Sequence, residues 1–357
     1  MACPQEPLLL VLALQALWSR AVEHLRIGIL GAAKIAPSAL VKPARAVPEV
    51  EVYAVAARDA ARAAKFAAKH GIGRVHDSYA ALLDDPAVDA VYNPLPNGLH
   101  GEWTIKALEA GKHVLCEKPF TANADEAEAV AAVAAGSGKV VMEAFHWRYH
   151  PLATRMREIV TSGVLGDVRR IETTMCIPLP FPKDIRYRYD LAGGATMDVG
   201  CYAIHQLRFL ADAEPTVTSA HARLAKPEVD RWMQADLAFD DGRTARITCA
   251  LWSATPLKLS IRVSGDQGEM SVFNATGPQF FNRVTVRALA GTTRERVRGG
   301  PTYEYQLQAF ADAVLRGGPV LTPPSDSIAN MRVIDAVYDA AGLARRVGSG
   351  TTPGGAG

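Results

Sequence analysis

The sequence predicts an α/β Rossmann domain followed by an α+β domain whose sheet is open and mainly antiparallel. From Leu25 onward, short β-rich runs alternate with longer Ala-rich amphipathic stretches, which is the pattern of a parallel sheet covered by helices. After Pro151 the pattern changes to a series of alternating polar and apolar strands, which indicates an antiparallel sheet. A length of 357 residues is enough for about two domains.

The first half of the chain is expected to alternate strands with helices. Each predicted helix has apolar residues three and four positions apart, which is the spacing of one helix face. The predicted strands are Arg26–Leu30, Glu51–Ala56, Ala87–Tyr92, His113–Leu115 and Val140–Glu143. The predicted helices are Ile35–Ala46, Ala60–His70, Gly101–Ala110 and Asn123–Ala135.

The second half is expected to begin with one helix after Pro151 and to continue through an antiparallel sheet. Its strands include Val168–Thr174, Val217–Ala225, Met233–Phe239 and Thr244–Leu251, and its closing helices are Tyr303–Leu315 and Ser325–Ala344. The predicted divisions are an N-terminal extension (1–24), the Rossmann domain (25–148), the second domain (149–346) and a tail (347–357). The Gly/Thr/Pro-rich end of the tail, Gly348–Gly357, is expected to be too polar and flexible to pack.

The composition is that of a soluble globular protein, with 49% hydrophobic and 21% charged residues. Lys and Arg number 39 against 37 Asp and Glu, and no long basic run is present, so nucleic acid is not expected as a partner. The five cysteines are scattered without a Cys-x-x-Cys pair, so they are interpreted as buried thiols in a reducing compartment. No metal site is predicted.

The N-terminus contains an apolar run, Leu8–Trp18, that resembles the core of a secretion signal. The run is too short to span a bilayer. Residues Met1–Pro7 carry Glu6 and no Lys or Arg, whereas a signal peptide begins with positive charge. Export remains the alternative, but we favour a dispensable extension before a cytoplasmic protein that does not contact a membrane.

The turn after the first predicted strand contains Gly31, Ala33 and Ala36 at the three positions of a Gly-x-Gly-x-x-Gly motif. Small residues there let the backbone approach a pyrophosphate at a helix N-terminus, which would involve Ala33, Lys34 and Ile35. Two of the three glycines are replaced, so a plain strand-to-helix turn is the alternative. The surrounding alternation of strands and helices favours dinucleotide binding.

At the end of the second predicted strand, Ala56 or Ala57 stands where an acidic residue would bind the ribose hydroxyls of NAD, and Arg58 follows at once. A guanidinium there can pair with the 2′-phosphate of NADP, so NADP is favoured over NAD. The alternatives are that Arg58 is a solvated residue and that Asp59 is only a helix N-cap.

Two further segments follow predicted strands, at the edge where parallel sheets bind ligands. They are Tyr92 to His100 and Cys116-Glu117-Lys118-Pro119. A lysine beside a cofactor can hydrogen-bond a substrate hydroxyl and lower the pKa of a neighbouring phenol. The alternative for Lys118 is an exposed loop residue.

Together these segments resemble the glucose-fructose oxidoreductase and inositol dehydrogenase family, Gfo/Idh/MocA, from about Leu25 to Ala344. The most specific signals are Glu117-Lys118-Pro119 after a strand, Asn93-Pro94-Leu95-Pro96-Asn97 with His100 upstream, and Gly193 to Tyr202 downstream. The resemblance implies that Lys118 is the active-site lysine, that its bond to Pro119 is cis, and that the sheet domain forms homodimers or homotetramers. It also implies a cofactor set of Gly31, Ala33, Lys34, Ile35, Arg58, Asn93, Pro94, Leu95, Asn97, His100, Glu117 and Lys118.

Asp198, Tyr202 and His205 are spaced to lie along one helix face. Members resembling glucose-fructose oxidoreductase and dimeric dihydrodiol dehydrogenase carry tyrosine at the position of Tyr202, so Tyr202 is predicted to donate and accept the proton. Its ordinary pKa of about 10 would have to be lowered by Lys118. Asp198 is expected to bind a substrate hydroxyl or orient Lys118. The alternatives are an N-cap for Asp198 and a core position for Tyr202.

The crossing between the domains contains His146, Arg148 and His150. By resemblance, Arg148 lies near the nicotinamide and substrate, and a substrate role is also expected for His205. His146 and His150 are interpreted as structural histidines.

The predicted activity is NADP-dependent hydride transfer at a carbinol or carbonyl carbon of a sugar, polyol or vicinal diol. The motifs are most similar to the dihydrodiol and D-xylose dehydrogenase branch. The alternatives are an NADPH-dependent keto-sugar reductase and a dinucleotide-binding regulator without catalysis.

Overall fold

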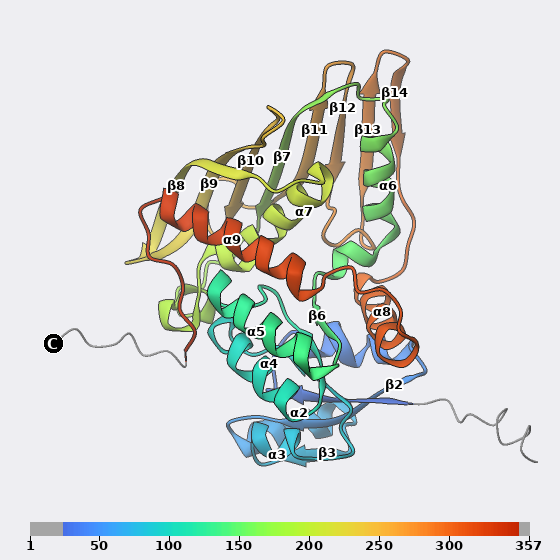
Figure 1. Cartoon of the computed structure of the whole chain (residues 1–357), viewed down its shortest axis with the longest axis vertical. Helices are drawn as coiled ribbons and strands as arrows, with labels where there is room; N and C mark the ends of the chain where they lie inside the picture. The colour runs from blue at the N-terminus through green and yellow to red at the C-terminus, as the bar shows by residue number, and fades with distance from the viewer. Residues whose placement is uncertain (1–23, 350–357) are drawn as a thin grey trace, which may run out of the picture.

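A computed structural model describes residues 24–349 of the chain. Almost all of the predicted N-terminal extension and most of the predicted tail lie outside the described residues. Two sheets organise the structure, with the Rossmann sheet below and the larger second sheet above in Figure 1. The predicted fold class is therefore confirmed.

The first sheet is parallel throughout and has the strand order β3-β2-β1-β4-β5-β6. Its central strands are buried on both faces, as expected of strands that lie between helical layers. The strands are β1 (Leu25–Leu30), β2 (Val50–Ala56), β3 (Arg74–His76), β4 (Ala90–Asn93), β5 (His113–Cys116) and β6 (Val141–Glu143).

Two helices of this domain begin or end as the sequence indicates. Asp59 and Asn123 cap α2 and α5, and Gly71 ends α2 in the left-handed conformation. The helical segments are α2 (Ala60–His70), α3 (Tyr79–Leu83), η3 (Asn97–Leu99), α4 (His100–Glu109) and α5 (Ala124–Ser137).

The helix predicted over Ile35–Ala46 is wrong. The segment forms a short π-helical turn, η1 (Pro37–Val41), and a 3₁₀ turn, η2 (Pro43–Arg45). Both turns begin with a proline, which has no backbone N–H to donate and so interrupts a regular α-helix.

The second sheet has the strand order β14-β13-β12-β11-β7-β10-β9-β8. Among the described strands of this second sheet, only β7 and β10 pair in parallel, and every other pair is antiparallel. The strands are β7 (Val168–Cys176), β8 (Thr216–Lys226), β9 (Val229–Ala238), β10 (Thr244–Ala250), β11 (Lys258–Gly265), β12 (Gly268–Phe273), β13 (Arg283–Ala288) and β14 (Gly291–Glu295).

Helices cover one face of this sheet, where Ile171 and Thr173 are buried and Thr173 bonds the carbonyl of Ala203. In Figure 1 these helices lie in front of the sheet. The helical segments after β6 are η4 (His146–Tyr149), α6 (Pro151–Thr161), η5 (Ile185–Tyr187), η6 (Tyr189–Leu191), η7 (Thr196–Gly200), α7 (Cys201–Ala211), α8 (Thr302–Arg316) and α9 (Pro324–Ala340). Of these, α7 packs on β7 and β10 and α9 packs on β8, whereas α8 packs on η1, η2 and β1 of the Rossmann domain.

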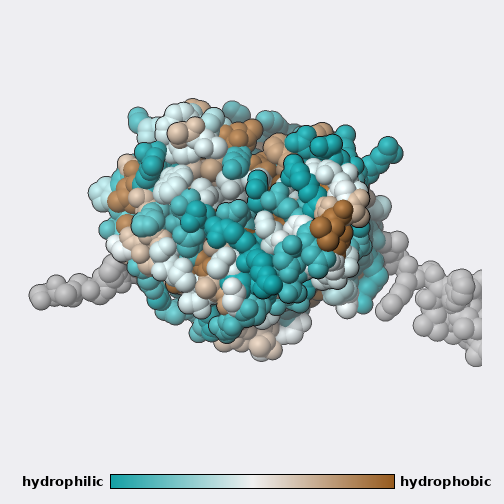
Figure 2. Space-filling model, turned by 90° about the horizontal axis from the view of Figure 1, so that it is seen from above, coloured by the Kyte–Doolittle hydropathy of each residue, from teal (hydrophilic) through white to brown (hydrophobic). Residues whose placement is uncertain are grey.

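The upper end of the second domain presents a mixed surface. In Figure 2, which looks onto this end, hydrophilic side chains predominate and the hydrophobic ones form separate spots. No helix within residues 24–349 is long and apolar enough to cross a bilayer.

The chain passes from the second domain back to the first near its C-terminus. Ser349 N–H donates to the carbonyl of Gly98, and the Ser349 hydroxyl donates to that of Asp190. Gly348 is buried. The prediction that Gly348–Gly357 cannot pack is therefore wrong for its first two residues, because backbone groups on both domains bind this segment.

Candidate active site

The candidate residues converge at the carboxyl edge of the Rossmann sheet. Gly31 follows β1, Leu95 follows β4 and Lys118 follows β5, and these three strands are neighbours in the sheet. Segments that follow adjacent parallel strands must meet at the same edge, where open α/β sheets bind ligands. Within residues 24–349, no group of three or more His, Cys, Asp or Glu side chains is arranged to hold a metal ion.

Gly31 has the backbone conformation that the dinucleotide motif requires. Its φ is +98°, and a β-carbon at this position would lie 3.1 Å from the side chain of Leu95. Such a conformation favours glycine strongly. Within the described residues, the N–H groups of Lys34 and Ile35 have no protein acceptor, so they can bind a phosphate.

Arg58 is exposed two residues after β2, and its side chain has no hydrogen-bond or ion-pair partner among residues 24–349. Asp59 accepts the N–H of Arg62, so the interpretation of Asp59 as an N-cap is correct. The Arg62 side chain donates to the carbonyl of Ala32 at 2.8 Å and thereby ties α2 to the Gly31 turn. Arg62 was missed by the sequence analysis because its partner is a backbone atom 30 residues away.

Asn93 and His100 hold the loops of the site rather than lining it. The Asn93 amide donates to the His100 carbonyl and to Thr104, and Asn93 is fully buried. The His100 ring nitrogens lie 2.7 Å from the carbonyls of Leu95 and Pro119. Since these side chains are committed to protein partners, we do not propose that they contact the dinucleotide.

The neighbouring segment is also tied down. Asn97 donates to the carbonyl of Ala192 across the two domains, and Pro94 is buried. The peptide bond between Lys118 and Pro119 is cis, as the resemblance implied.

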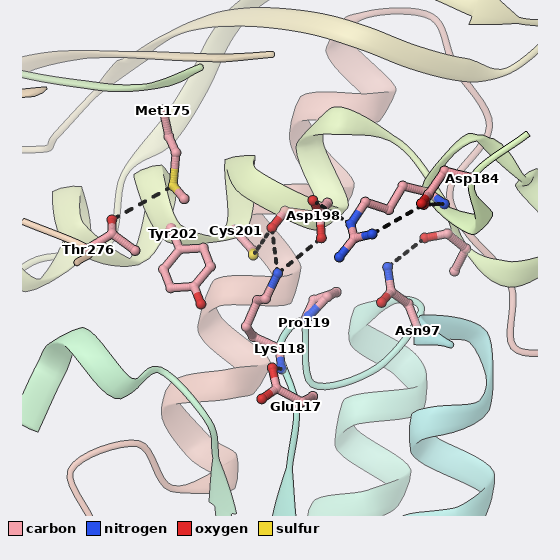
Figure 3. A network of polar contacts seen from close by, with 12 residues as sticks. Asn97, Glu117, Lys118, Pro119, Met175, Asp184, Asp198, Cys201, Tyr202 and Thr276 are labelled. Carbon is pink, nitrogen blue, oxygen red and sulfur yellow. Dashed lines mark hydrogen bonds and ion pairs between the residues drawn. The ribbon is translucent and has the colours of Figure 1, made fainter. Parts of the chain in front are cut away.

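Asp198 lies between two cations (Figure 3). One carboxylate oxygen is 3.1 Å from Lys118 Nζ, and the other is 2.9 Å from Arg186 Nε. Lys118 also donates to the Asp198 carbonyl at 2.8 Å, and Arg186 also pairs with Asp184 at 3.2 Å. The residues predicted from two distant segments are therefore in direct contact.

These contacts set the charges of the pair. Burial alone would raise the pKa of Asp198, but Lys118 and Arg186 outweigh it and hold that pKa below its ordinary value. Burial alone would lower the pKa of Lys118, but the Asp198 carboxylate holds it above its ordinary value. An ionised carboxylate and a protonated amine therefore lie side by side at neutral pH.

Asp198 is inside the helical turn η7, whose N-cap is Ala195. The alternative interpretation of Asp198 as an N-cap is thus wrong. Gly193 permits this arrangement, because a β-carbon there would lie 2.6 Å from the Arg186 carbonyl. The glycine pair before η7 lets the Arg186 segment approach Asp198 closely.

Tyr202 follows one helical turn after Asp198, and its ring faces Lys118. Lys118 Nζ lies 5.0 Å from the ring centroid, and the hydroxyl is 3.1 Å from His146 Nε2. The pKa of Tyr202 lies well above its ordinary value, first because the side chain is buried and then because Tyr303 and Glu117 are close. The expected lowering of this pKa by Lys118 is not found, since the ammonium lies over the ring and is neutralised by Asp198.

Glu117 holds the loop that carries Lys118. It is buried and accepts a hydrogen bond from the Tyr92 hydroxyl at 2.7 Å. Burial raises its pKa above the ordinary value, although the neighbouring Lys118 opposes this. The side chain faces the protein interior and so anchors the loop that carries Lys118.

His205 and Arg148 lie away from this cluster. The His205 ring nitrogens bond Trp147 at 3.2 Å and Asp326 at 2.9 Å, and Phe145 stacks on the ring at 4.1 Å. Arg148 packs its guanidinium on Phe209 at 4.1 Å. Both side chains have protein partners, so we do not propose the substrate contacts expected for them.

Two members of the cluster, Arg186 and His146, are not indicated as functional residues by the sequence. Arg186 lies in the single 3₁₀ turn η5, and no local pattern distinguishes it from the other arginines nearby. His146 was interpreted as structural, whereas it bonds Tyr202. His150 does have the structural role expected, because it accepts the Leu152 N–H at the start of α6.

Comparison with known proteins places both sheets in one family. Residues 25–145 match the model of an oxidoreductase family with an NAD-binding Rossmann fold, and residues 153–271 match the Gfo/Idh/MocA C-terminal domain. The D-xylose 1-dehydrogenase (NADP(+)) 2 of Haloferax volcanii is 39% identical over 318 residues, which cover 88% of this chain and 96% of that protein. A dTDP-3,4-didehydro-2,6-dideoxy-alpha-D-glucose 3-reductase of Streptomyces violaceoruber is 35% identical over 301 residues, or 83% of this chain and 87% of that one.

A solved structure also matches the chain over both domains. A 3-ketoreductase from Actinomadura kijaniata, in complex with NADP and TDP-benzene, superposes with a TM-score of 0.82 and is 31% identical. The match covers 89% of this chain and 98% of the ketoreductase. With both domains matched and a relative of 39% identity over most of its length, the chain belongs to the Gfo/Idh/MocA family of oxidoreductases.

Proposed function

We propose that the protein is an NADP-dependent oxidoreductase that transfers a hydride between nicotinamide and a carbinol or carbonyl carbon of a sugar, polyol or vicinal diol. The observation that carries the proposal is the contact of Lys118 with Asp198 and with the ring of Tyr202, at the sheet edge next to the Gly31 turn. The NADP-dependent D-xylose dehydrogenase, at 39% identity, supports both the cofactor and the substrate class.

The residues at the sheet edge fit NADP. The Gly31 turn offers free N–H groups and a surface without a side chain for the pyrophosphate, and the unpaired Arg58 guanidinium matches the 2′-phosphate. When bound, the nicotinamide supplies or accepts the hydride. The chain itself then has to bind the substrate oxygen and move one proton.

We assign proton transfer to Tyr202 and electrostatic support to Lys118. The ammonium of Lys118 can hydrogen-bond the substrate oxygen and stabilise negative charge that develops on it. Asp198 keeps Lys118 protonated and fixes its position. Arg186 fixes Asp198 from the other side, so it is a positioning residue in this scheme.

A keto-sugar reductase is the second candidate, because the same groups would serve the reverse reaction. The 3-reductase of Streptomyces violaceoruber, at 35% identity, favours it. The convergence of Lys118, Asp198 and Tyr202 favours an enzyme over a regulator without catalysis. The ratio of turnover in the two directions at neutral pH distinguishes dehydrogenase from reductase.

The test is a screen of aldoses, polyols and dihydrodiols for NADP reduction, beginning with D-xylose, followed by Lys118→Ala and Tyr202→Phe on the best substrate. We expect about a 100- to 10,000-fold loss of kcat for Tyr202→Phe, the usual contribution of a positioned proton donor. NADP affinity should change little. Lys106→Ala, on the exposed face of α4, is the control. Full turnover by Lys118→Ala would contradict the assignment.

We further propose that the protein is cytoplasmic, that the domains divide near residue 148, and that the second sheet forms a homodimer or homotetramer. The sheet face opposite the helices supports the last point. It is hollow and lined by polar and charged residues, among them Glu172, Arg246, Lys258, Arg262, Thr285 and Arg294. Sedimentation of the full chain tests the assembly, and a monomer at micromolar concentration would contradict it.

A further inference from the structure

A chain of hydrogen-bonding groups leads from Tyr202 into the protein interior. The Tyr202 hydroxyl is 3.1 Å from His146 Nε2, and His146 Nδ1 is 2.8 Å from the hydroxyl of Thr302. The three side chains come from α7, η4 and α8, and all of them are buried. The sequence analysis had assigned His146 no part in the chemistry.

Both hydroxyls can donate or accept, so a neutral imidazole fits between them in two ways. In the first, Tyr202 donates to Nε2 and Nδ1–H donates to Thr302. In the second, Thr302 donates to Nδ1 and Nε2–H donates to the Tyr202 oxygen. Only the second leaves the phenolic proton free to point at a substrate oxygen, and only the second suits a phenolate, which has no proton to donate.

The surroundings keep the imidazole neutral. Burial and the nearby charge of Lys118 lower the pKa of His146 to about 3. The ring of Tyr303 packs on the imidazole with centroids 4.2 Å apart. Among the described residues, the titratable groups facing His146 are therefore Tyr202, Tyr303 and Lys118, and no carboxylate is hydrogen-bonded to the ring. A protonated, positively charged imidazolium is unfavourable here, whereas a change of tautomer leaves the ring neutral.

We propose that His146, with its Nε2–H tautomer selected by Thr302, is a positioning residue that donates a hydrogen bond to Tyr202 and stabilises its phenolate. The inference rests on the proposed proton-transfer role of Tyr202. In reduction, the Tyr202 O–H bond breaks, its proton moves to the substrate oxygen, and Nε2–H holds the phenolate until solvent reprotonates it. In oxidation, the phenolate accepts the substrate's hydroxyl proton, and the regenerated phenol later releases one proton to solvent.

The hydrogen bond from His146 would compensate for the unfavourable burial of the Tyr202 phenolate. Burial disfavours the phenolate of Tyr202, and the ammonium of Lys118 lies over the ring and is paired with Asp198. A directed N–H donor at the oxygen offsets the loss of water there, since a hydrogen bond to a charged group is stronger than one between neutral groups.

The test compares the pH profiles of kcat in the oxidation direction for the full-length wild type, His146→Met and His146→Gln, with NADP and the best aldose. For His146→Met we expect about a 10- to 100-fold loss of kcat. The pH at which activity rises should move upward by about one to two units. KM for NADP should stay within about threefold, and His146→Gln, which can still donate, should recover part of the rate.

Two further variants separate this role from a structural one. Thr302→Val should shift the profile in the same direction as His146→Met, whereas Thr302→Ser, which keeps the hydroxyl, should not. His113→Met is the matched control, because His113 is a partly buried histidine with a pKa lowered to about 4 by burial, at the opposite edge of the sheet. Its profile should be that of the wild type.

A wild-type pH profile for His146→Met would overturn the inference. If His146→Met does not fold, wild-type profiles for His146→Gln and Thr302→Val would overturn it instead. A doubly protonated His146 at pH 7 would also overturn it. This is measured from the ring ¹⁵N signals that disappear in His146→Gln. The proposed function fails separately, if Tyr202→Phe keeps full turnover. An inactive Tyr202→Phe with a wild-type profile for His146→Met rejects only the inference.

Discussion

Replacing Asp198 by asparagine removes one negative charge from between two positive ones without changing the shape of the side chain. Its oxygens lie 3.1 Å from Lys118 and 2.9 Å from Arg186. At an effective dielectric constant of 20, each of these attractions is about 5 kcal/mol before the cost of desolvation. Desolvation offsets most of this in the wild type, but the variant leaves both cations near each other and unpaired.

Breaking a buried ion pair by removing one partner destabilises a protein by about 3 to 5 kcal/mol. Lys118 is well buried, whereas the Arg186 side chain is 41% exposed and can be solvated. We therefore expect Asp198→Asn to lose about 3 kcal/mol of unfolding free energy and about 5 to 10 °C in Tm. Asp190→Asn, which breaks an exposed pair with Arg188, should lose less than about 0.5 kcal/mol.

The pH dependence of this difference has a definite sign. The pKa of Asp198 is below its reference value of 3.8 in the folded state, so the carboxylate stabilises the fold above that pH. Its contribution is lost as the pH falls through the folded value. The pKa of Lys118 is above its reference of 10.5, so its contribution is complete below that pH and is lost as the pH rises further.

Urea unfolding of the wild type and Asp198→Asn at several pH values provides the measurement. The difference in unfolding free energy should be constant from about pH 5 up to the pH at which Lys118 of the variant begins to lose its proton, and should shrink on either side of this range. In the variant, burial and Arg186 still lower the pKa of Lys118, and the Asp198 carboxylate that opposes them most in the wild type is gone, so the alkaline loss of activity should move to lower pH. Equal stability of the two proteins at pH 7, or an unchanged alkaline limb, would refute the coupled arrangement.

Three other substitutions test the cofactor site and the interior. Arg58→Ala should raise KM for NADP about 10- to 100-fold and leave KM for NAD nearly unchanged, because only NADP has the 2′-phosphate; an equal effect on both cofactors would contradict this. Gly31→Ala should lose about 1 to 2 kcal/mol and weaken NADP binding measured by titration calorimetry, since its φ of +98° strains any side chain. Arg346→Met should lose about 3 to 5 kcal/mol in urea unfolding, because Arg346 and Asp230 form a fully buried ion pair and the Asp230 carboxylate would lose its cation.

Most of the Rossmann sheet could be predicted because its longer strands are separate apolar runs that alternate with amphipathic segments. β3 and α3 were missed, since three largely exposed residues and a single helical turn carry no periodic signal. The failed helix at Ile35–Ala46 had the right apolar spacing. Periodicity describes which face is buried, but it does not include the missing N–H groups of Pro37 and Pro43.

The contact of Lys118 with Asp198 could be anticipated, because one residue follows a strand at the ligand-binding edge and the other lies in a motif of the same family. Arg186 could not. Arg186 reaches Asp198 only because Gly193 lets the η5 turn approach closely, and no local sequence pattern encodes that approach. His146 was known as a histidine between two domains, and only the tertiary structure places its two nitrogens on Tyr202 and Thr302.

The expected effect of Lys118 on Tyr202 is wrong for a reason that applies to many sites. A sequence gives the signs of two charges, but their interaction depends on distance, direction and competing partners. Here the ammonium is 5.0 Å from the ring centroid and is bonded to Asp198, so burial dominates the pKa of the phenol. In the tautomer that we propose, the hydrogen bond from neutral His146 to the phenol oxygen is then the contact through which the protein can favour the phenolate. If so, the identity of residue 146 should influence the pH profile more strongly than the net charge around Lys118.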